Sequence, residues 1–309
     1  MRELYERLAG EVGKVVVGQD EAVRGLVSGL AVGGHVLLEG PPGVAKTLLA
    51  SALARALGLQ FARVQFTPDM LPSDLTGTST LRAGELAFRP GPVFTNVLLA
   101  DEINRTPPKT QAALLEAMQE GQVSADGASR PLPDPFLVVA TQNPIEYEGT
   151  YPLPEAQLDR FLMKIDVGYP GADGELRMLG LARAGLRPLS LDDVQVVAEA
   201  GDVRTARAAV DAVAVADDVA AYLVEIVRRT RELPSVTLGA SPRAAVHLLA
   251  AAKAAAALVG RTFVTPDDVA ALAEPVLAHR LVLRPEAELE RYDASAAVRT
   301  ALESVRVPR

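Results

Sequence analysis

A glycine-rich turn between an apolar segment and a helix-like segment constrains this chain more than any other feature. Residues 39–47 read Glu-Gly-Pro-Pro-Gly-Val-Ala-Lys-Thr, follow the apolar run 35–38 and precede an expected helix over 48–57. A loop that wraps a phosphate must point several backbone N–H groups at one anion, and glycine allows this because it has no Cβ atom. The order strand, turn, Lys-Thr, helix therefore predicts a phosphate-binding loop in an α/β fold.

The side chains of this loop have separate expected roles. Lys46 can reach the β- and γ-phosphates of a nucleotide, and the Thr47 hydroxyl can ligate Mg2+. Ala45 stands where the usual pattern has glycine, so we expect helical backbone angles there. An ordinary strand-to-helix turn is the alternative interpretation. The loop residues expected to contact the nucleotide are Gly40, Pro41, Pro42, Gly43, Val44, Ala45, Lys46, Thr47 and Leu48.

Two adjacent acids follow the short apolar segment 97–100. Such a segment suits a central parallel strand buried on both faces, and open α/β sheets bind ligands beyond the carboxyl ends of their strands. Asp101 is then placed to hold Mg2+ through water, and Glu102 to polarise the water that attacks a γ-phosphate. Two solvated acids at a strand end are the alternative.

A second buried strand is expected over residues 136–141, and Gln-Asn-Pro follows it. Asn143 at the tip of that strand could hydrogen-bond the γ-phosphate or the attacking water. Asn-Pro is equally a common turn, so both interpretations stay open for this residue.

Composition excludes several classes of function. The 309 residues are 49% apolar and 23% charged with a net charge of -8, which gives no global basic field of the kind that binds nucleic acid non-specifically. There is no cysteine and there are three histidines, so disulfides, thiolate metal sites and histidine clusters are not expected. The first residues are charged and no apolar stretch is long enough to span a bilayer, so we expect a cytoplasmic protein without a membrane span.

The chain divides by pattern into two expected domains. Residues 1–172 predict an α/β nucleotide-binding domain, and residues 173–309 predict an all-helical second domain with apolar residues at helical spacing. Two helices of the second domain have clear starts at Ser241-Pro242 and Thr265-Pro266, each an N-cap followed by proline. Two hairpins interrupt the first domain, one around Ala83-Gly84 and one around Asp126-Gly127.

Taken together, these motifs resemble the MoxR branch of the AAA+ ATPases, over residues 16–284. The hairpins match insertions of the helix-2-insert group, which includes magnesium chelatase motor subunits. Five motifs carry the resemblance in the family's order: Gly-Pro-Pro-Gly-Val-Ala-Lys-Thr at 40–47, Ala-Asp-Glu-Ile-Asn-Arg at 100–105, Ala-Thr-Gln-Asn-Pro at 140–144, Leu-Pro-Glu-Ala-Gln-Leu-Asp-Arg-Phe at 153–161 and Ala-Ser-Pro-Arg at 240–243.

The resemblance implies a three-layer P-loop NTPase domain, a helical lid and a ring, usually of six subunits, with ATP between neighbours. By motif, Asn143 resembles the residue that senses the γ-phosphate, and Arg160 the arginine finger given to the neighbouring subunit's ATP. Arg243 resembles the lid arginine that reads the nucleotide state, and Gly18 and Gln19 match the segment beside the adenine. A guanidinium from another chain can stabilise the spread charge of phosphoryl transfer only once the ring has assembled.

The leading hypothesis is a chaperone-like ATPase that uses ATP and Mg2+ to remodel or mature protein complexes. The resemblance also implies a partner with a von Willebrand factor A domain, and it leaves the role of Arg105 open. Alternatives are a nucleic-acid-stimulated motor, which the acidic balance opposes, and a nucleotide-switched scaffold, which the intact acid pair opposes. Nucleic acid is therefore not an expected partner.

Overall fold

The chain forms two compact units. The computed structural model describes residues 1–82, 85–125, 127–144, 149–183 and 190–308. The sheet unit comprises Glu3–Leu153 and Ile165–Arg204, and the helical unit comprises Met1–Arg2, Pro154–Lys164 and Thr205–Arg309. The segment Pro154–Lys164 therefore packs with the helical unit, although the residues before and after it in the sequence belong to the sheet unit. The domain division expected at residue 172 stays a prediction.

A five-stranded sheet in the order β2-β5-β8-β1-β9 is the centre of the sheet unit. The neighbours β2 and β5, β5 and β8, and β8 and β1 pair in parallel. Every residue of β5 is buried, as expected for a parallel strand that is covered on both faces. The predicted α/β class is thereby confirmed. The strands are β1 (Val36–Glu39), β2 (Phe61–Gln65), β5 (Val97–Asp101), β8 (Leu137–Gln142) and β9 (Met163–Asp166).

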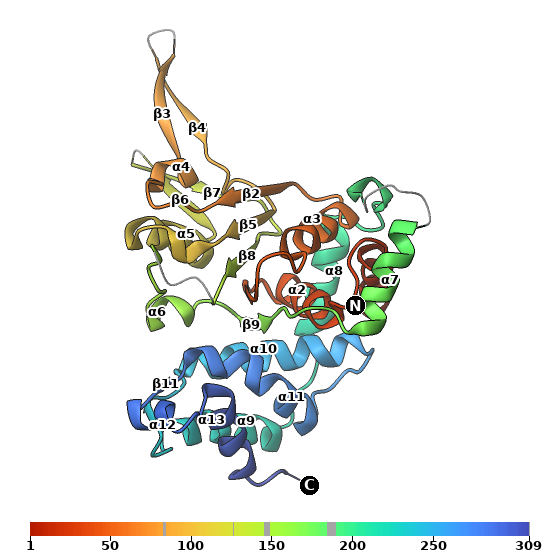
Figure 1. Cartoon of the computed structure of the whole chain (residues 1–309), viewed down its shortest axis with the longest axis vertical. Coiled ribbons are helices and arrows are strands. Elements are labelled where there is room, and N and C mark those ends of the chain that lie inside the picture. The colour runs from red at the N-terminus through yellow and green to blue at the C-terminus, as the bar shows by residue number, and fades with distance from the viewer. Residues whose placement is uncertain (83–84, 126, 145–148, 184–189, 309) are drawn as a thin grey trace. The chain divides into compact units, whose positions relative to one another are not determined.

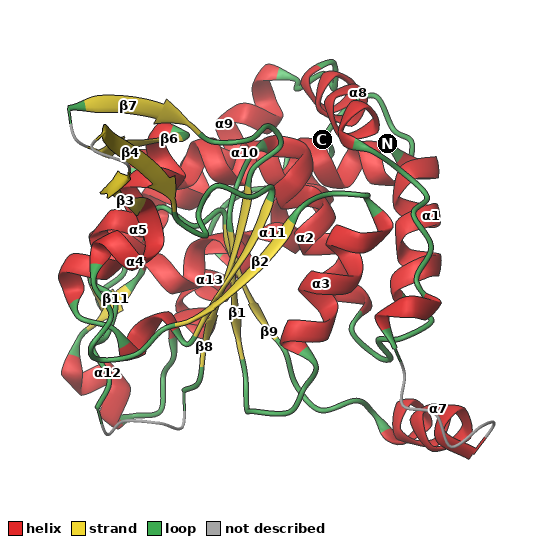
Figure 2. Ribbon diagram, turned by 90° about the horizontal axis from the view of Figure 1, so that it is seen from above, coloured by secondary structure: helices red, strands yellow, loops and turns green. Residues whose placement is uncertain are grey.

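Helices flank this sheet. Figure 2 shows α3 on one side of the strands and the α4 and α5 pair on the other. The apolar faces of α2 and α3 pack on the strands, because their buried residues recur at helical spacing. The helices are α1 (Arg2–Val12), α2 (Asp20–Val32), α3 (Lys46–Ala56), α4 (Pro72–Thr76) and α5 (Pro108–Glu120).

A buried histidine fastens α5 to the sheet. The Val138 N–H donates to His35 Nδ1 at 3.0 Å, so the proton sits on Nε2, which donates to the Met118 carbonyl at 3.0 Å. Burial lowers the pKa of His35 from its ordinary value to about 4. This histidine is therefore neutral at physiological pH and has a purely structural place.

Two hairpins stand outside the sheet. The first pairs β3 (Gly77–Arg82) with β4 (Glu85–Pro90) and projects beyond α4 (Figure 1), and the second pairs β6 (Gln122–Ala125) with β7 (Ala128–Pro131). The guanidinium of Arg130 lies 3.9 Å from the centre of the Phe88 ring, which joins one hairpin to the other. Both predicted hairpins form, although the turn residues Ala83, Gly84 and Asp126 lie outside the described residues.

The chain after β9 returns along the sheet unit. It forms α7 (Ala172–Arg183), the short η2 (Leu191–Asp193) and α8 (Ala200–Asp211). Between η2 and α8, the Val197 N–H donates to the Ala56 carbonyl at 2.8 Å, and Arg7 donates to the Val197 carbonyl at 2.8 Å. This segment thereby ties α1 to the end of α3.

The helical unit is built from amphipathic helices, as the sequence predicts. Ser241 and Thr265 cap α10 and α11 through their hydroxyl groups, which confirms the two expected starts. A small ladder of β10 (Val236–Leu238) and β11 (Val282–Leu283) was not predicted, because strands this short carry no periodic pattern. The other elements are α6 (Glu155–Leu158), α9 (Asp217–Thr230), α10 (Pro242–Leu258), α11 (Pro266–Leu277), η3 (Ala278–Arg280), α12 (Pro285–Leu289) and α13 (Ala294–Glu303).

Among the helices of the described residues, none combines the length and apolar character that crossing a membrane requires.

Candidate functional site

Three segments predicted to contact a nucleotide meet at one edge of the sheet. β8 lies between β1 and β5, and their register pairs Leu38 with Thr141 and Ala100 with Ala140. The carboxyl ends of these parallel strands are therefore adjacent. The loop 40–47, the acid pair and Asn143 follow those ends directly, which is where open α/β sheets bind their ligands.

The phosphate loop has two backbone features that its residue types explain only in part. A Cβ atom on Gly40 would lie 2.1 Å from the Val167 carbonyl oxygen, so only glycine fits there. Gly43 has a φ of +84°, and Ala45, the N-cap of α3, has a φ of +62°. The expectation of helical angles at Ala45 is therefore wrong. A left-handed residue here turns successive N–H groups toward one side, and it costs an alanine about 1–2 kcal/mol.

Lys46 lies folded across its own loop. Its ammonium group donates to the Gly40 carbonyl at 2.6 Å and to the Pro41 carbonyl at 3.3 Å. An ammonium held by loop carbonyls faces the same space as the loop N–H groups. A phosphate there would meet a full positive charge as well as the positive end of the α3 dipole.

Asp101 is oriented from two sides. The Thr141 hydroxyl donates to its Oδ1 at 2.6 Å, and Arg63 donates to its Oδ2 through Nε at 3.0 Å and Nη2 at 2.7 Å. The carboxylate is thus buried in an environment that already accepts a cation. Such an environment, with a hydroxyl and a carboxylate as oxygen donors, suits Mg2+.

Glu102 begins the short helix η1 (Ile103–Arg105) with a φ of +57°, a second left-handed residue at this sheet edge. Its N–H donates to the Thr141 hydroxyl at 2.9 Å. Its Oε2 accepts from Gln65 at 2.6 Å and lies 3.0 Å from Arg105 Nε. Arg105, whose role the sequence left open, is thus an ion-pair partner of this carboxylate.

Three residues of this edge were missed by the sequence reasoning, namely Arg63, Gln65 and Thr141. Arg63 and Gln65 are two positions apart on β2, and the register places Gln65 beside Asp101. Their polarity within an otherwise strand-like segment was the available signal. It could acquire a meaning only once β2 was known to neighbour β5.

Gly18 and Gln19 lie beside the segment that follows β9. Gly18 has a φ of +74° and packs against Pro170, and Gln19 donates from Nε2 to the Gly168 carbonyl at 3.0 Å. Two backbone segments from opposite ends of the sheet unit are thereby held together.

Arg160 and Arg243 belong to the helical unit. Arg160 follows Asp159, the C-cap of α6, and Arg243 is exposed in the first turn of α10. The Ser241 hydroxyl donates to Asp159 at 2.9 Å and 3.0 Å, so the segments that carry the two arginines are bonded to each other.

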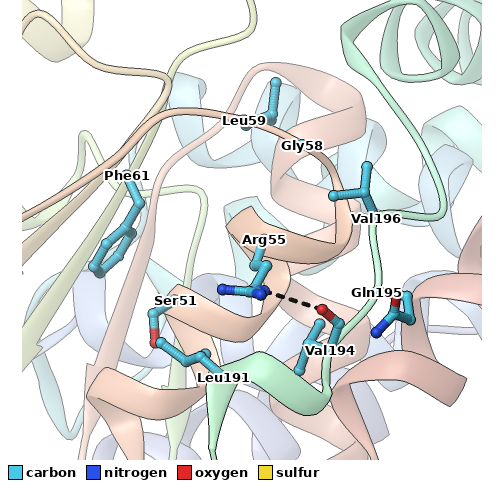
Figure 3. A pocket seen from close by; sticks show the side chains of 9 residues that line it. All are labelled: Ser51, Arg55, Gly58, Leu59, Phe61, Leu191, Val194, Gln195 and Val196. Atoms are coloured by element: carbon cyan, nitrogen blue, oxygen red, sulfur yellow. Dashed lines mark hydrogen bonds between the residues drawn. The ribbon is translucent and has the colours of Figure 1, made fainter.

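A separate pocket of about 420 Å³ lies at the far end of α3 (Figure 3). Arg55 crosses it and donates to the Val194 carbonyl at 3.0 Å. Because Arg55 is in the last turn of α3 and the phosphate loop precedes the first, about 15 Å of helix separates the two. The pocket is therefore not part of the predicted nucleotide site.

Comparison with known proteins identifies the family. Residues 35–163 match the family described as "ATPase family associated with various cellular activities (AAA)", and residues 228–301 match "AAA lid domain". The chain is 44% identical to the chaperone MoxR1 of Mycobacterium tuberculosis over 98% of this chain and 82% of that protein. This chain belongs to the MoxR family of AAA+ ATPases.

Other relatives of this MoxR-family protein span nearly its whole length. It is 47% identical to the uncharacterized protein YeaC of Bacillus subtilis, over 100% of this chain and 96% of that one. A crystal structure from Cytophaga hutchinsonii, named as a candidate ATPase, superposes with a TM-score of 0.91 at 42% identity and covers 100% of this chain and 96% of that one. The family and the fold predicted from the five motifs are confirmed, and the protein is an ATPase with an AAA lid.

Proposed function

We propose that this MoxR-family ATPase hydrolyses ATP to ADP and phosphate with Mg2+, and that it uses this reaction to remodel or mature protein complexes. The observation that carries the proposal is the convergence of the phosphate loop, the acid pair and Asn143 at one sheet edge. A nucleotide-switched scaffold would need no water-activating carboxylate, yet Glu102 has defined hydrogen bonds there.

The phosphate loop holds the triphosphate in this proposal. Residues 40–48 offer N–H groups, and Lys46 exchanges its bonds to the Gly40 and Pro41 carbonyls for bonds to phosphate oxygens. Thr47 and Asp101 hold Mg2+, which supplies charge neutralisation at the phosphate oxygens when bound. No group of three or more His, Cys, Asp or Glu that could hold a metal occurs among the described residues. In this proposal, phosphate and water supply the other Mg2+ ligands.

Glu102 and Asn143 act on the attacking water. The Glu102 carboxylate accepts a hydrogen bond from that water and orients it toward the γ-phosphorus. Its present partners, Gln65 and Arg105, hold the carboxylate in a defined place. Asn143, which is buried and directly follows β8, hydrogen-bonds the γ-phosphate or the water.

We place the ATP between neighbouring subunits of a ring, with six subunits as the expected number. Arg160 is the finger given to the next subunit's ATP, Arg243 is the lid arginine, and Gly18 and Gln19 flank the adenine. A planar guanidinium suits the spread negative charge of the transferring phosphoryl group. Both arginines lie in one compact unit, which supports a common response to the nucleotide.

The client is a protein complex in this proposal, and the relative MoxR1 is itself named a chaperone. A protein with a von Willebrand factor A domain is the proposed partner, and the cytoplasm the proposed location. The projecting β3-β4 hairpin offers one aromatic ring, Phe88, and the Arg130 guanidinium lies over one face of it, so the hairpin has no row of aromatic rings on which successive bases could stack. This supports a protein client over nucleic acid.

Steady-state ATP hydrolysis against protein concentration, with the mass measured in parallel, tests the proposal. We expect the rate per chain to rise as oligomers form. Arg160→Ala should remove turnover while ATP still binds, and Glu102→Gln should do the same from within the site. A rate per chain that does not change with assembly, together with an active Arg160→Ala variant, would mean that the site is complete in one subunit.

A further inference from the structure

A buried arginine holds the backbone on both sides of Arg160. Arg280, the last residue of η3, donates from Nη2 to the carbonyls of Asp159, at 3.3 Å, and of Phe161. Its Nη1 donates to the Leu162 carbonyl at 3.4 Å and to the Val276 carbonyl. The carbonyls that immediately precede and follow Arg160 therefore share one guanidinium. Few other side chains could do this, because arginine alone offers five donors in a rigid fork.

Asp159 completes the arrangement. Its Oδ1 accepts from Arg280 Nε at 2.9 Å. Both of its oxygens also accept from the Ser241 hydroxyl, at 2.9 Å and 3.0 Å, and Ser241 caps α10 by accepting from the Ala244 N–H. The carboxylate next to Arg160 is thus oriented from η3 on one side and from the start of α10 on the other.

Burying this charged pair in a helical core costs desolvation free energy. Arg280 is 4% exposed, and burial lowers its pKa from the ordinary value to about 10, which leaves it charged at neutral pH. His247 Nδ1 lies 2.5 Å from Arg280 Nη2 and accepts from it, so it shares the two N–H groups of that nitrogen with the Asp159 and Phe161 carbonyls. Apolar residues of similar volume often stabilise such a site as well or better, so this buried ion pair contributes a defined geometry rather than additional stability.

We propose that Asp159 and Arg280 are positioning residues that fix the place and direction of Arg160 as it is presented to a neighbouring subunit. The proposal rests on the proposed role of Arg160 as a finger. The pair touches neither nucleotide nor water. It acts by holding the backbone from which the Arg160 side chain projects, so that the guanidinium meets the transferring phosphoryl group without searching many orientations.

Mixed rings separate this role from a general effect on stability. Asp159→Asn keeps the size of the side chain and removes its charge. Alone, we expect this variant to bind ATP normally and to turn it over about 10–100-fold more slowly, because small misplacements of catalytic groups have effects of this size. Its own ATP site is complete, however, so a neighbour with a properly held Arg160 restores it.

Glu102→Gln subunits supply such a neighbour, since they carry an intact Arg160 and an ATP site that does not hydrolyse ATP. Equal mixtures of Asp159→Asn with Glu102→Gln should recover about one quarter of the native rate per chain, because half of the sites are intact and half of those receive an intact finger. Mixtures of Asp159→Asn with Arg160→Ala should not exceed the rate of Asp159→Asn alone, because neither variant supplies a properly held finger.

Asp268→Asn is the matched control. Asp268 pairs with Arg261 at 2.6 Å and 2.5 Å and belongs to the Thr265-Pro266 cap of α11, in the same unit and in the same kind of motif. It should lower the melting temperature and leave turnover within about twofold of native, as expected for a pair that bonds to no residue of the site. If Asp159→Asn fails to fold, Ser241→Gly replaces it, since glycine is accepted at a helix N-cap and the change removes the hydroxyl that bonds Asp159.

The outcomes are distinct. Full turnover by Arg160→Ala alone would overturn the proposed finger and this inference with it. If Arg160→Ala is inactive and is restored by Glu102→Gln, while Asp159→Asn is either fully active or slow and not restored, the finger stands and the positioning role is wrong. Restoration of Asp159→Asn by Glu102→Gln but not by Arg160→Ala is the result we expect.

Discussion

The two aspartate–arginine pairs of this protein use the same chemistry in opposite ways. In the sheet unit, the Arg63 side chain is 49% exposed and the side chain of its partner Asp101 is 11% exposed. In the helical unit, the Arg280 side chain is 1% exposed and the side chain of its partner Asp159 is 20% exposed. The first pair has a covered carboxylate and an arginine that can leave, whereas the second has a covered arginine that cannot. In the proposed function, the Asp101 carboxylate accepts a metal and so needs an exchangeable partner, whereas the backbone around Arg160 presents a finger and so needs a fixed one.

Removing the buried arginine should have the largest effect. We expect Arg280→Ala to lower the free energy of unfolding by about 3–5 kcal/mol, because it leaves a carboxylate and several carbonyls without their buried donor. Urea denaturation measures this. Arg261→Ala, which breaks a more exposed pair in the same unit, is the control and should cost less. Equal losses in the two variants would contradict the distinction between fixed and exchangeable pairs.

Acid should loosen the helical unit through His247. Burial, and then the positive charge of Arg280, lower the pKa of His247 to about 4, with Asp159 raising it and Arg243 lowering it. The unfolded chain takes up this proton near its ordinary pKa of about 6.5 and the folded chain does not, so stability is present above pH 6.5 and is lost as the pH falls toward 4. The loss reaches about 3 kcal/mol for this residue.

The check is the free energy of unfolding measured between pH 7 and pH 4.5. His247→Gln should flatten the fall in this window. His35, whose pKa is also lowered to about 4 by burial, should give a similar slope in the sheet unit, and His35→Asn provides the comparison. An unchanged slope in both variants would assign the acid sensitivity to carboxylates or to His279, the third histidine, whose pKa is also lowered by burial.

The exposed pair should matter for the metal and hardly for the fold. Arg63→Ala should change the free energy of unfolding by about 0–1 kcal/mol, since exposed pairs are screened by solvent. It should lower the Mg2+ concentration at half-maximal turnover, because Arg63 and the cation compete for the Asp101 carboxylate. A titration of turnover with Mg2+ gives the answer, and a higher Mg2+ requirement would show that Arg63 assists the metal.

The smallest effect is expected at Ala45. Ala45→Gly removes the strain of a left-handed alanine, about 1–2 kcal/mol, and gives back part of it through the greater freedom of glycine in the unfolded chain. A gain of about 0.5 kcal/mol in the free energy of unfolding should result. Ala50→Gly in the middle of α3 is the control and should destabilise by about 1 kcal/mol. A loss in both variants would mean that the angles at Ala45 carry no strain.

Much of the fold and part of the site were predictable from local patterns. Strands β1, β5 and β8 are short apolar runs that end in polar residues. In a parallel sheet the carboxyl ends of such strands lie at the same edge, whatever the length or sequence of the loops between them. The phosphate loop and the acid pair were found for that reason. The lid helices were found by their spacing and their Ser-Pro and Thr-Pro starts, because caps are local interactions.

Residues that act through distant partners were not predictable in this way. Thr141 joins Asp101 to Glu102, and Gln65 meets Glu102, only because β2, β5 and β8 are neighbours in the sheet. The segment Pro154–Lys164 lies between two sequence stretches of the sheet unit and yet packs with the helical unit. No local pattern shows such an assignment, since it depends on which surfaces bury together.

The sequence alone determined the fold class, the family and the places of the phosphate loop and acid pair, because each rests on residues close together in the chain. Only the tertiary structure decided that Ala45 is left-handed, where the contact of Gly40 with Val167 and the start of α3 leave the loop little choice. It also decided that Asp159 meets Arg280 across 121 positions. Contacts at such separation follow from the packing of whole elements, which short-range propensities do not encode.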